Sequence, residues 1–315
     1  MSQPKPTFLV TFERWPDAWM DELRAVAPGS TIIQPRSREG IPWEEVVALN
    51  GNLNREILAK SPKLKWFHSP AAGVEGYLFP GMVASPVVLT NSRGVYGIFI
   101  AEIAMAHVLA HTTRLLANIY REDRRTWLRN SLRGFELYES TALIIGLGSI
   151  GSEIAKRARA FSMKLIALDP VVTHADGVEV HPPEEIDEVL PRADVLFISA
   201  PATTARGLLN RERIFRMKKG AYLVNVSRGP IVETNALVEA LQCGHLAGAG
   251  LEVVEPEPLP PDHPLWSMTN VTITPHIGGM TDQVDRRRFE CLKENLRRFV
   301  LDEPLLHIVD KKRGY

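Results

Sequence analysis

A glycine-rich turn between an apolar segment and an amphipathic segment constrains the fold of this chain more than any other feature. Residues 141–169 read TALIIGLGSIGSEIAKRARAFSMKLIALD. Gly146, Gly148 and Gly151 form the pattern G-x-G-x-x-G, which permits a tight turn, close approach of a pyrophosphate to the backbone, and close packing of a helix on a strand. The segment therefore predicts a strand, a turn and a helix that together bind a dinucleotide.

Two more features of this segment support a dinucleotide site. The predicted helix begins with free backbone N–H groups at Ser149 and Ile150, and its dipole favours the negative charge of a phosphate. Asp169 falls 18 residues after Gly151, close to the roughly 20 residues at which a carboxylate binds the ribose hydroxyls. A carboxylate there repels the extra phosphate of NADP, so we expect NAD as the cofactor.

Short apolar segments alternate with segments of helical periodicity along most of the chain. In the second half the predicted strands are TALIIG (141–146), KLIALD (164–169), VLFISA (195–200), AYLVNV (221–226) and VTITP (271–275). In the first half they are TFLVTF (7–12), TIIQP (31–35), LKWFHS (64–69) and VVLTN (87–91). This alternation predicts βαβ units and parallel sheets.

The predicted helices divide the chain into two units. They cover residues 16–27 and 43–60, begin again after Ser149, Pro182, Asn210 and Thr234, and include two long segments at 98–121 and 281–300. Because the long segments border the second unit, we expect an α/β fold with two Rossmann-like or flavodoxin-like parallel-sheet domains, the cofactor domain inserted into the substrate domain. The expected NAD-binding domain is 101–288, and the substrate domain is 1–100 with 289–315.

Composition excludes several classes of function. Lys+Arg and Asp+Glu both number 37, so no net charge favours nucleic acid or an anionic membrane. Cys243 and Cys291 give neither a disulfide framework nor a metal-ligand spacing. His107 and His111 lie four residues apart on a predicted helix, but no third ligand accompanies them, so we expect packing or solvent contact and no metal.

The sequence also suggests a location. Its first residues contain no charged-then-apolar signal segment. The most apolar run, residues 97–110, contains Glu102 and His107 and is too short to span a bilayer. We therefore expect a cytoplasmic protein of enzyme size.

Three ionisable residues fall where the second sheet should bind a ligand. Arg228 and His276 each follow a predicted strand, and Glu257 lies in the loop before His276, between Pro256 and Pro258. Reduction of a 2-keto acid by hydride needs a cation for the carboxylate, an acid for the oxygen, and a group that keeps the acid protonated. Taken alone, Arg228 is better explained as a structural ion pair, Glu257 as a loop carboxylate and His276 as a capped strand end. Their joint occurrence after a dinucleotide motif favours a catalytic site.

The chain resembles the D-isomer-specific 2-hydroxyacid dehydrogenases. The matching segments are GLGSIG, MKKGAYLVNVSRGPIVETNALVEAL and GAGLEVVEPEPLPPDHPLWSMTNVTITPHIGG, in order and spacing, and the weaker matches are KWFHSPAAGVE and NSRGVYGIFIAE. Together they cover nearly the whole chain. The resemblance implies that Arg228 binds the substrate, His276 is the acid/base and Glu257 holds His276.

The same resemblance implies further site residues. Backbone N–H groups of Ala72 and Gly73 would receive the substrate carboxylate across an interdomain cleft. Further cofactor-binding residues would be Ala200, Pro201, Val226, Ser227 and Glu252. Glu252 stands where the family usually has Asp, a residue that contacts the nicotinamide carboxamide.

Other positions leave alternatives open. Arg93 stands where many relatives carry proline, and it is either a surface residue or a contact for the far end of a substrate. Trp127 falls where family members build a dimer arm, so it is either an interface residue or a core anchor. Residues that surround the substrate side chain are expected in the first domain, around Trp66, Tyr77, Tyr96 and Phe99.

The resemblance implies an NAD-dependent enzyme and a homodimer. Its reaction would be the reversible reduction of a 2-keto acid, similar to glyoxylate, hydroxypyruvate or phenylpyruvate, to a D-2-hydroxy acid. The alternative is an NADH-sensing scaffold with little turnover, although scaffolds need docking segments and no long extension is present. A formate dehydrogenase would pair its histidine with glutamine, and a phosphoglycerate dehydrogenase would often carry a regulatory extension.

Overall fold

The computed structural model describes residues 6–12, 14–37, 39–120, 127, 133–201 and 205–314. The chain divides into two compact units: unit 1 comprises Met1–Tyr96 and Asp282–Tyr315, and unit 2 comprises Gly97–Thr281. Both are built on parallel sheets, and unit 2 interrupts the sequence of unit 1. The predicted α/β fold with one domain inserted into another is therefore confirmed.

The breaks between the units fall earlier than the sequence suggests. They lie at 96/97 and 281/282, whereas the expected boundaries were 100/101 and 288/289. The reason is that two helices each belong whole to one unit. Helix α4 (Gly97–Thr112) lies in unit 2, and helix α11 (Val284–Val300) lies in unit 1.

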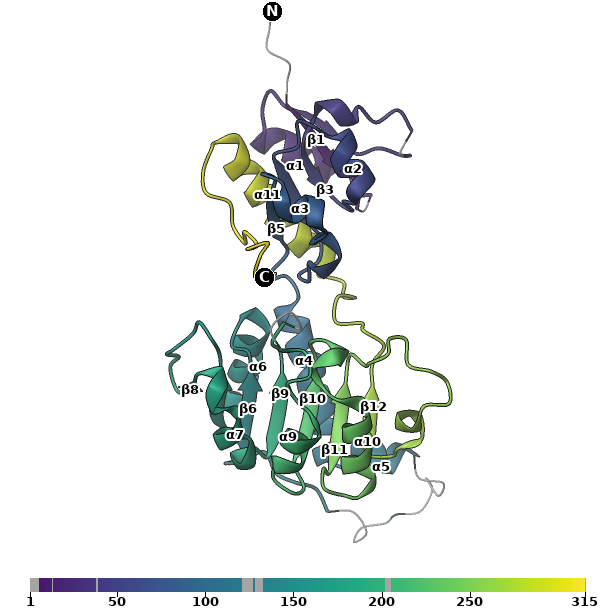
Figure 1. Cartoon of the computed structure of the whole chain (residues 1–315), viewed down its shortest axis with the longest axis vertical. Coiled ribbons are helices and arrows are strands. Elements are labelled where there is room, and N and C mark those ends of the chain that lie inside the picture. Colours follow the sequence, from purple (N-terminus) through teal and green to yellow (C-terminus); the bar gives the residue numbers. More distant parts are fainter. Residues whose placement is uncertain are drawn as a thin grey trace, which may run out of the picture. The chain divides into compact units, whose positions relative to one another are not determined.

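The described residues of unit 2 form a seven-stranded parallel sheet with the order β12-β11-β10-β9-β6-β7-β8 (Figure 1). Its strands are β6 (Thr141–Ile145), β7 (Lys164–Leu168), β8 (Glu179–His181), β9 (Val195–Ile198), β10 (Tyr222–Asn225), β11 (Gly248–Leu251) and β12 (Val271–Ile273). The strand order reverses between β6 and β9. In open parallel sheets ligands bind at such a reversal, beyond the carboxyl ends of the strands.

Helices cover both faces of this sheet. Besides α4, they are α5 (Leu115–Tyr120), α6 (Ser149–Ala160), α7 (Ile186–Val189), α9 (Arg211–Arg216) and α10 (Thr234–Gln242), with 3-10 turns η3 (Pro183–Glu185), η4 (Leu190–Arg192), η5 (Gly229–Ile231) and η6 (Pro264–Ser267). Ala104 of α4 and Ile154 of α6 pack on Phe197 of the sheet. Ile186 of α7 and Leu237 of α10 belong to the second core cluster. Because both faces are buried, the strands read as continuous apolar runs.

Strand β3 (Val46–Asn50) of unit 1 corrects the prediction of a helix over residues 43–60. Only η1 (Trp43–Glu45) and α2 (Arg55–Lys60) within that segment are helical. Strand β3 pairs with its neighbours on both sides and lies inside the sheet. Periodicity alone does not distinguish a short buried strand from a buried helical turn, which explains the error.

Two strands of unit 2 are also absent from the sequence-based prediction. Strand β8 lies at the edge of the sheet and has only three residues. Strand β11 reads GAGL, and small residues have low strand propensity. Its small residues admit α4, because a Cβ atom on Gly250 would overlap the side chain of His107.

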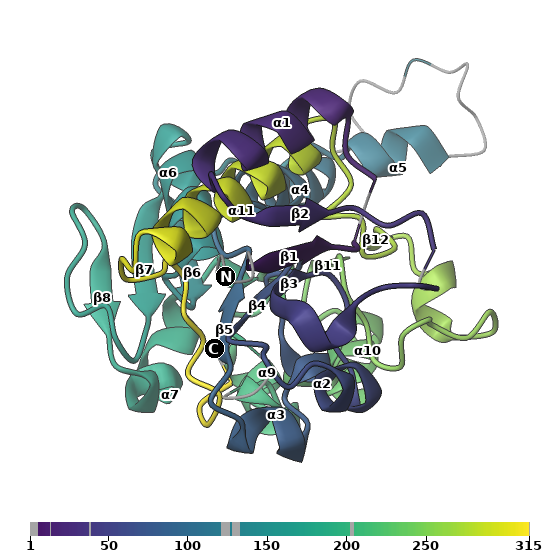
Figure 2. The same ribbon diagram turned by 90° about the horizontal axis from the view of Figure 1, so that it is seen from above.

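The described residues of unit 1 form a five-stranded parallel sheet with the order β2-β1-β3-β4-β5. The strands not yet given are β1 (Thr7–Val10), β2 (Thr31–Ile33), β4 (Trp66–Ser69) and β5 (Val88–Asn91), and the remaining helical segments are α1 (Asp17–Val26), η2 (Glu75–Tyr77) and α3 (Pro80–Ala84). Helices α1 and α11 lie side by side over one face, where Leu23 and Phe289 share a core cluster (Figure 2). Ile57 of α2 and Met82 of α3 form the core of the other face.

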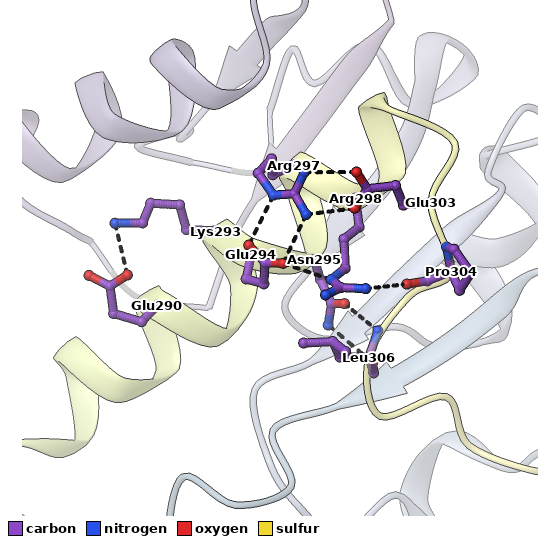
Figure 3. A network of polar contacts seen from close by, with 9 residues as sticks. All are labelled: Glu290, Lys293, Glu294, Asn295, Arg297, Arg298, Glu303, Pro304 and Leu306. Carbon is purple, nitrogen blue, oxygen red and sulfur yellow. Dashed lines mark hydrogen bonds and ion pairs between the residues drawn. The ribbon is translucent and has the colours of Figure 1, made fainter.

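Polar contacts tie the residues after α11 to unit 1. Asn295 is fully buried; its Nδ2 donates to the Leu306 carbonyl at 3.2 Å, and its Oδ1 accepts from the Leu306 N–H at 2.7 Å. Figure 3 shows this pair beside the ion pairs of Arg297. Further on, the Val309 N–H donates to the Leu89 carbonyl at 2.9 Å. The end of the chain is thereby held against β5.

Candidate active site

The glycine-rich turn between β6 and α6 has little room for side chains. Gly146 has a φ of +90°, and a Cβ atom on it would lie 2.8 Å from the Ala200 nitrogen. A Cβ atom on Gly151 would overlap the Gly146 carbonyl oxygen. Gly148 faces open space at the start of α6, a helix of 12 residues whose first N–H groups receive no side-chain cap. This cradle fits the pyrophosphate of a dinucleotide.

The carboxylate of Asp169 lies against the same turn. Its Oδ2 accepts a hydrogen bond from the Leu147 N–H at 2.7 Å. Its Oδ1 accepts from the N–H groups of Val171 and Val172, both at 2.8 Å. The structure therefore fixes a negative charge beside the glycine turn, where the sequence suggests a ribose-binding carboxylate.

The ends of β9 and β10 meet beside this turn. The Ser227 hydroxyl donates to the Ala200 carbonyl, and the Val226 N–H donates to the Ile198 carbonyl at 3.2 Å. Pro201 follows Ala200 on the surface. The four positions expected to line the cofactor site here thus lie at one edge of the sheet, and their contact with a cofactor stays a prediction.

Arg228 follows β10 and is fixed through its backbone. The side chain of Asn225, which is 1% exposed, donates Nδ2 to the Arg228 carbonyl at 2.9 Å and accepts from the Ser227 N–H at 3.1 Å. The half-buried guanidinium of Arg228 donates Nη1 to the Ser227 carbonyl at 2.9 Å. Asn225 is absent from the sequence-based prediction, although an asparagine that ends a fully apolar strand is a recognisable signal.

His276 and Glu257 form a direct pair. The Nδ1 atom of His276 lies 2.6 Å from Oε1 of Glu257, and the two side chains are 46% and 41% exposed. His276 follows β12 with a φ of +53°, and the peptide bonds before Pro256 and Pro258 are both cis. A carboxylate in this place accepts a hydrogen bond from Nδ1 and orients the imidazole ring. Because Nδ1 is bound, Nε2 is the ring nitrogen that can exchange a proton with a ligand.

Arg228, Glu252 and His276 follow three neighbouring parallel strands, β10, β11 and β12. Their backbones therefore emerge at one edge of the sheet. Glu252 is only 3% exposed, and its carboxylate accepts hydrogen bonds from the Thr274 hydroxyl and the Gly278 N–H. Burial raises the pKa of Glu252, against the opposing effects of those two hydrogen bonds and of His276. Its contact with the nicotinamide stays a prediction.

Ala72 and Gly73 lie in unit 1, in the loop that follows β4. The side chain of Asn91 donates to the Ala72 carbonyl at 2.7 Å and holds this loop. Binding of a substrate carboxylate by the two N–H groups is untested. Arg93 is exposed. The pKa of His307 is lowered mainly by the burial of its ring and also by the positive charge of Arg93. Either interpretation of Arg93 therefore stands.

Three other histidines, His68, His107 and His111, are buried. Burial lowers the pKa of His68 to about 3 and that of His107 to about 4, so both are neutral at physiological pH and unsuited to donate a proton. His68 bonds to Thr90, and His107 and His111 both bond to Thr272. In the part of the chain that the structure describes, no three His, Cys, Asp or Glu side chains are grouped to hold a metal ion.

The exposure of two aromatic residues bears on their interpretation. Trp66 is 2% exposed and donates Nε1 to the Thr90 hydroxyl, so its side chain lies in the core of unit 1. Trp127 is 92% exposed, so its interpretation as a core anchor is wrong. Across the described ranges, no helix combines the length and apolar character needed to cross a membrane.

Known proteins with similar sequences and structures include several dehydrogenases. The model of the D-isomer specific 2-hydroxyacid dehydrogenase NAD binding domain matches residues 105–278. The sequence is 36% identical over 256 residues to a glyoxylate reductase from Thermofilum pendens, covering 79% of this chain and 75% of that protein. It is 32% identical over 296 residues to a D-3-phosphoglycerate dehydrogenase from Methanocaldococcus jannaschii, covering 92% of this chain and 56% of that protein.

The chain thus spans about half the length of that second relative. Its fold is similar to the crystal structure of a D-isomer specific 2-hydroxyacid dehydrogenase from Xanthobacter autotrophicus Py2 in complex with NADPH and MES. The TM-score is 0.85 at 29% identity, over 98% of this chain and 99% of that one.

Proposed function

Because the chain belongs to the D-isomer-specific 2-hydroxyacid dehydrogenase family, we propose that it reversibly reduces a 2-keto acid to a D-2-hydroxy acid with NADH. The observation that supports this function most is the contact of 2.6 Å between His276 and Glu257. It pairs an acid/base with a carboxylate at the sheet edge to which the backbone of Arg228 is also fixed.

The glycine cradle fits a nicotinamide dinucleotide, which when bound supplies or accepts the hydride. Within the protein, the N–H groups of Ser149 and Ile150 would hold its phosphates. The other residues that would hold it are Gly146, Gly148, Gly151, Asp169, Ala200, Pro201, Val226, Ser227 and Glu252. All of them follow strands of the unit 2 sheet or begin α6.

NAD is the proposed form of the cofactor. Asp169 supports this choice, because its carboxylate is fixed against the glycine turn by the Leu147 N–H and would repel a phosphate on the adenosine ribose. The structural relative from Xanthobacter autotrophicus contains NADPH, so the preference needs a direct test. The catalytic efficiencies with NADH and NADPH, measured on one substrate, provide it.

The proton steps follow from the geometry of the pair. In reduction, Nε2 of His276 gives its proton to the ketone oxygen, and Glu257 stabilises the imidazolium before that transfer. In oxidation, the neutral ring takes the proton back. The guanidinium of Arg228 binds the substrate carboxylate and polarises the ketone. The N–H groups of Ala72 and Gly73 would receive the same carboxylate.

Both glyoxylate reductases and D-3-phosphoglycerate dehydrogenases are among the relatives. We propose a small 2-keto acid of the glyoxylate, hydroxypyruvate or phenylpyruvate type. A panel of these acids, followed by NADH absorbance, tests the activity and ranks the substrates. If no acid of the panel is reduced although NADH binds, the alternative of an NADH-sensing scaffold is favoured.

We further propose a cytoplasmic homodimer. Unit 2 exposes large apolar side chains, with Trp127 at 92%, Leu115 at 54% and Trp266 at 52%. A contiguous exposed apolar patch often marks a protein interface, whereas single exposed apolar side chains are ordinary, so the oligomeric state is to be measured directly. Light scattering should give twice the chain mass of 35.2 kDa, and a monomer would contradict the proposal.

A further inference from the structure

A chain of hydrogen bonds leads from helix α4 to the neighbourhood of His276. Nε2 of His111 lies 3.2 Å from the Thr272 hydroxyl, which lies 2.6 Å from Nδ1 of His107. Nε2 of His107 lies 3.1 Å from the Thr274 hydroxyl, which donates to Oε2 of Glu252. We call these five residues the polar chain. Both histidines and Glu252 are less than 9% exposed.

At the His111 end of the polar chain, the donor and the acceptor of each hydrogen bond can be assigned. Nε2 of His111 lies 3.1 Å from the Ala249 carbonyl oxygen, which only accepts hydrogen bonds. This nitrogen therefore carries a proton and also faces the Thr272 hydroxyl as a donor. The Thr272 hydroxyl has two acceptors in reach, the Ala249 carbonyl oxygen at 3.5 Å and Nδ1 of His107 at 2.6 Å. We assign its hydrogen to the much shorter contact with His107.

At the Glu252 end of the polar chain, the hydrogen bonds run in the same donor-to-acceptor direction. The ring of His107 is neutral, so only one of its nitrogens carries a hydrogen. With Nδ1 accepting from Thr272, Nε2 donates to Thr274, and Thr274 donates to the carboxylate of Glu252. Each hydrogen bond between members of the polar chain is thus donated toward Glu252. In this assignment no donor faces a donor, and no acceptor faces an acceptor.

Glu252 in turn holds the turn that carries His276. Its carbonyl oxygen accepts from the His276 N–H at 3.0 Å, and its Oε1 accepts from the Gly278 N–H at 2.5 Å. His276 has a φ of +53°, a conformation that non-glycine residues keep only where the surroundings hold it. Both ends of the turn 276–278 are therefore attached to one buried residue.

Strand β11 is shaped for this arrangement. Gly248 and Gly250 leave room for the two histidines: a Cβ atom on Gly250 would overlap His107, and one on Gly248 would lie 3.2 Å from Nδ1 of His111. The small residues of β11 thus allow the two histidines of α4 to pack against β11 and reach the threonines of β12 and of the residues after it.

We propose that Thr274 and His107 are positioning residues for His276. By orienting the carboxylate of Glu252, they hold the turn 276–278 so that the His276 ring meets Glu257. This role rests on the proposed function, because the acid/base chemistry of His276 is what converts the position of its ring into a rate. Glu252 would thus hold the turn 276–278 in addition to any contact that it makes with a cofactor.

The direct test is Thr274→Val, which removes the hydroxyl and keeps the shape of the side chain. We expect kcat for keto-acid reduction to fall about tenfold, because the step that needs His276 slows. The Gly278 amide should exchange with solvent about tenfold faster, since the Glu252 carboxylate that accepts its hydrogen bond loses the contact with Thr274. Amide exchange is measured by NMR on the full chain without substrate.

Two comparisons separate positioning from general damage. Thr269→Val is the matched control, because Thr269 is exposed and lines the same surface groove as Thr272 and Thr274; it should leave kcat and Gly278 exchange unchanged. His107→Gln keeps a donor for Thr274, whereas His107→Leu does not. We expect Gln to retain most of the activity and Leu to resemble Thr274→Val.

The outcomes distinguish this role from the proposed function. If the wild-type protein reduces no 2-keto acid, the proposed function fails, and Gly278 exchange still tests the polar chain. Unchanged Gly278 exchange in a folded Thr274→Val protein overturns the inference. If that variant does not fold, the histidine variants decide: equal Gly278 exchange in His107→Leu and His107→Gln overturns it equally.

Discussion

Nδ1 of His276 lies 2.6 Å from Oε1 of Glu257, although 19 positions separate the two residues in the sequence. The topology of the sheet explains this contact. Glu257 lies in the loop that follows β11, and His276 follows β12, the parallel neighbour of β11. The carboxyl ends of neighbouring parallel strands meet at one edge, so the loop returns its carboxylate to the imidazole.

Asp169 should set the preference for NADH. In Asp169→Ser, the ratio of kcat/KM for NADH to that for NADPH should fall about tenfold or more, since a repulsion of about 1.4 kcal/mol corresponds to a factor of ten. Steady-state kinetics with both cofactors measure the ratio. The control is Asp176→Ser, which removes an exposed carboxylate outside the glycine turn. A wild-type protein that already prefers NADPH contradicts this role.

Arg228 should be required for the substrate rather than for folding. Arg228→Lys keeps the charge but loses the planar fork that can hold a carboxylate, so kcat/KM for the keto acid should fall about 100-fold or more. The affinity for NADH, measured by fluorescence titration, should be unchanged. Arg206→Lys, at an exposed arginine of the same unit, serves as the control. Near-normal turnover in a folded Arg228→Lys protein argues against the assignment.

Asn295 should stabilise unit 1 through its two hydrogen bonds to Leu306. Asn295→Ala removes both hydrogen bonds to the Leu306 backbone and should lower the free energy of unfolding by about 1–3 kcal/mol. Arg298→Ala, at a partly exposed ion pair in the same network (Figure 3), should lower it by less than about 1 kcal/mol. Urea unfolding measures both. Equal losses in the two variants would show that burial of Asn295 does not matter.

His68 should make the stability of unit 1 depend on pH. Burial lowers its pKa from 6.5 to about 3 in the folded protein, so below pH 6.5 the unfolded chain binds a proton that the folded chain does not. The contribution is fully present above pH 6.5 and is lost as the pH falls toward about 3, by up to about 1.4 kcal/mol per pH unit.

The measurement is urea unfolding at several pH values in wild type and His68→Gln. Other groups titrate in both proteins, so the difference between the two pH dependences isolates His68. The stability of wild type should fall more steeply than that of the variant below pH 6.5. Parallel curves would mean that His68 is protonated in the folded state.

Much of the fold and the outline of the site follow from local sequence patterns. The turn requires glycine at Gly146 for its backbone conformation and at Gly151 for close packing, so its pattern identifies both the strand before it and the helix after it. Arg228 and His276 each follow a strand of the unit 2 sheet, and the edge where such strands end is set by parallel topology. These features depend on residues that are close in sequence.

The features that sequence patterns miss depend on distant residues. His107 bonds to Thr272, 165 positions away, and the contact exists because α4 packs over β11. No periodicity of α4 indicates that partner. Strand β3 was misread for a related reason: its apolar run becomes a strand only because strands pair with it on both sides.

His276 should be required in both directions of the reaction. His276→Gln removes the group that exchanges the proton, so reduction and oxidation should both fall about 100-fold or more, since general acid–base catalysis contributes about 10²–10⁴-fold. Circular dichroism and NADH binding should be unchanged. A folded variant that retains most of its activity would show that another group supplies the proton.

The pH–rate profiles of wild type and Glu257→Gln test the central claim most directly. The substitution removes the charge that favours the protonated imidazole and keeps most of the shape. Under conditions where chemistry limits the rate, reduction should begin to fall at a lower pH than in wild type, and the optimum for oxidation should also move toward acid. If both profiles stay where they are in wild type, Glu257 is a loop carboxylate and the proposed acid/base pair is wrong.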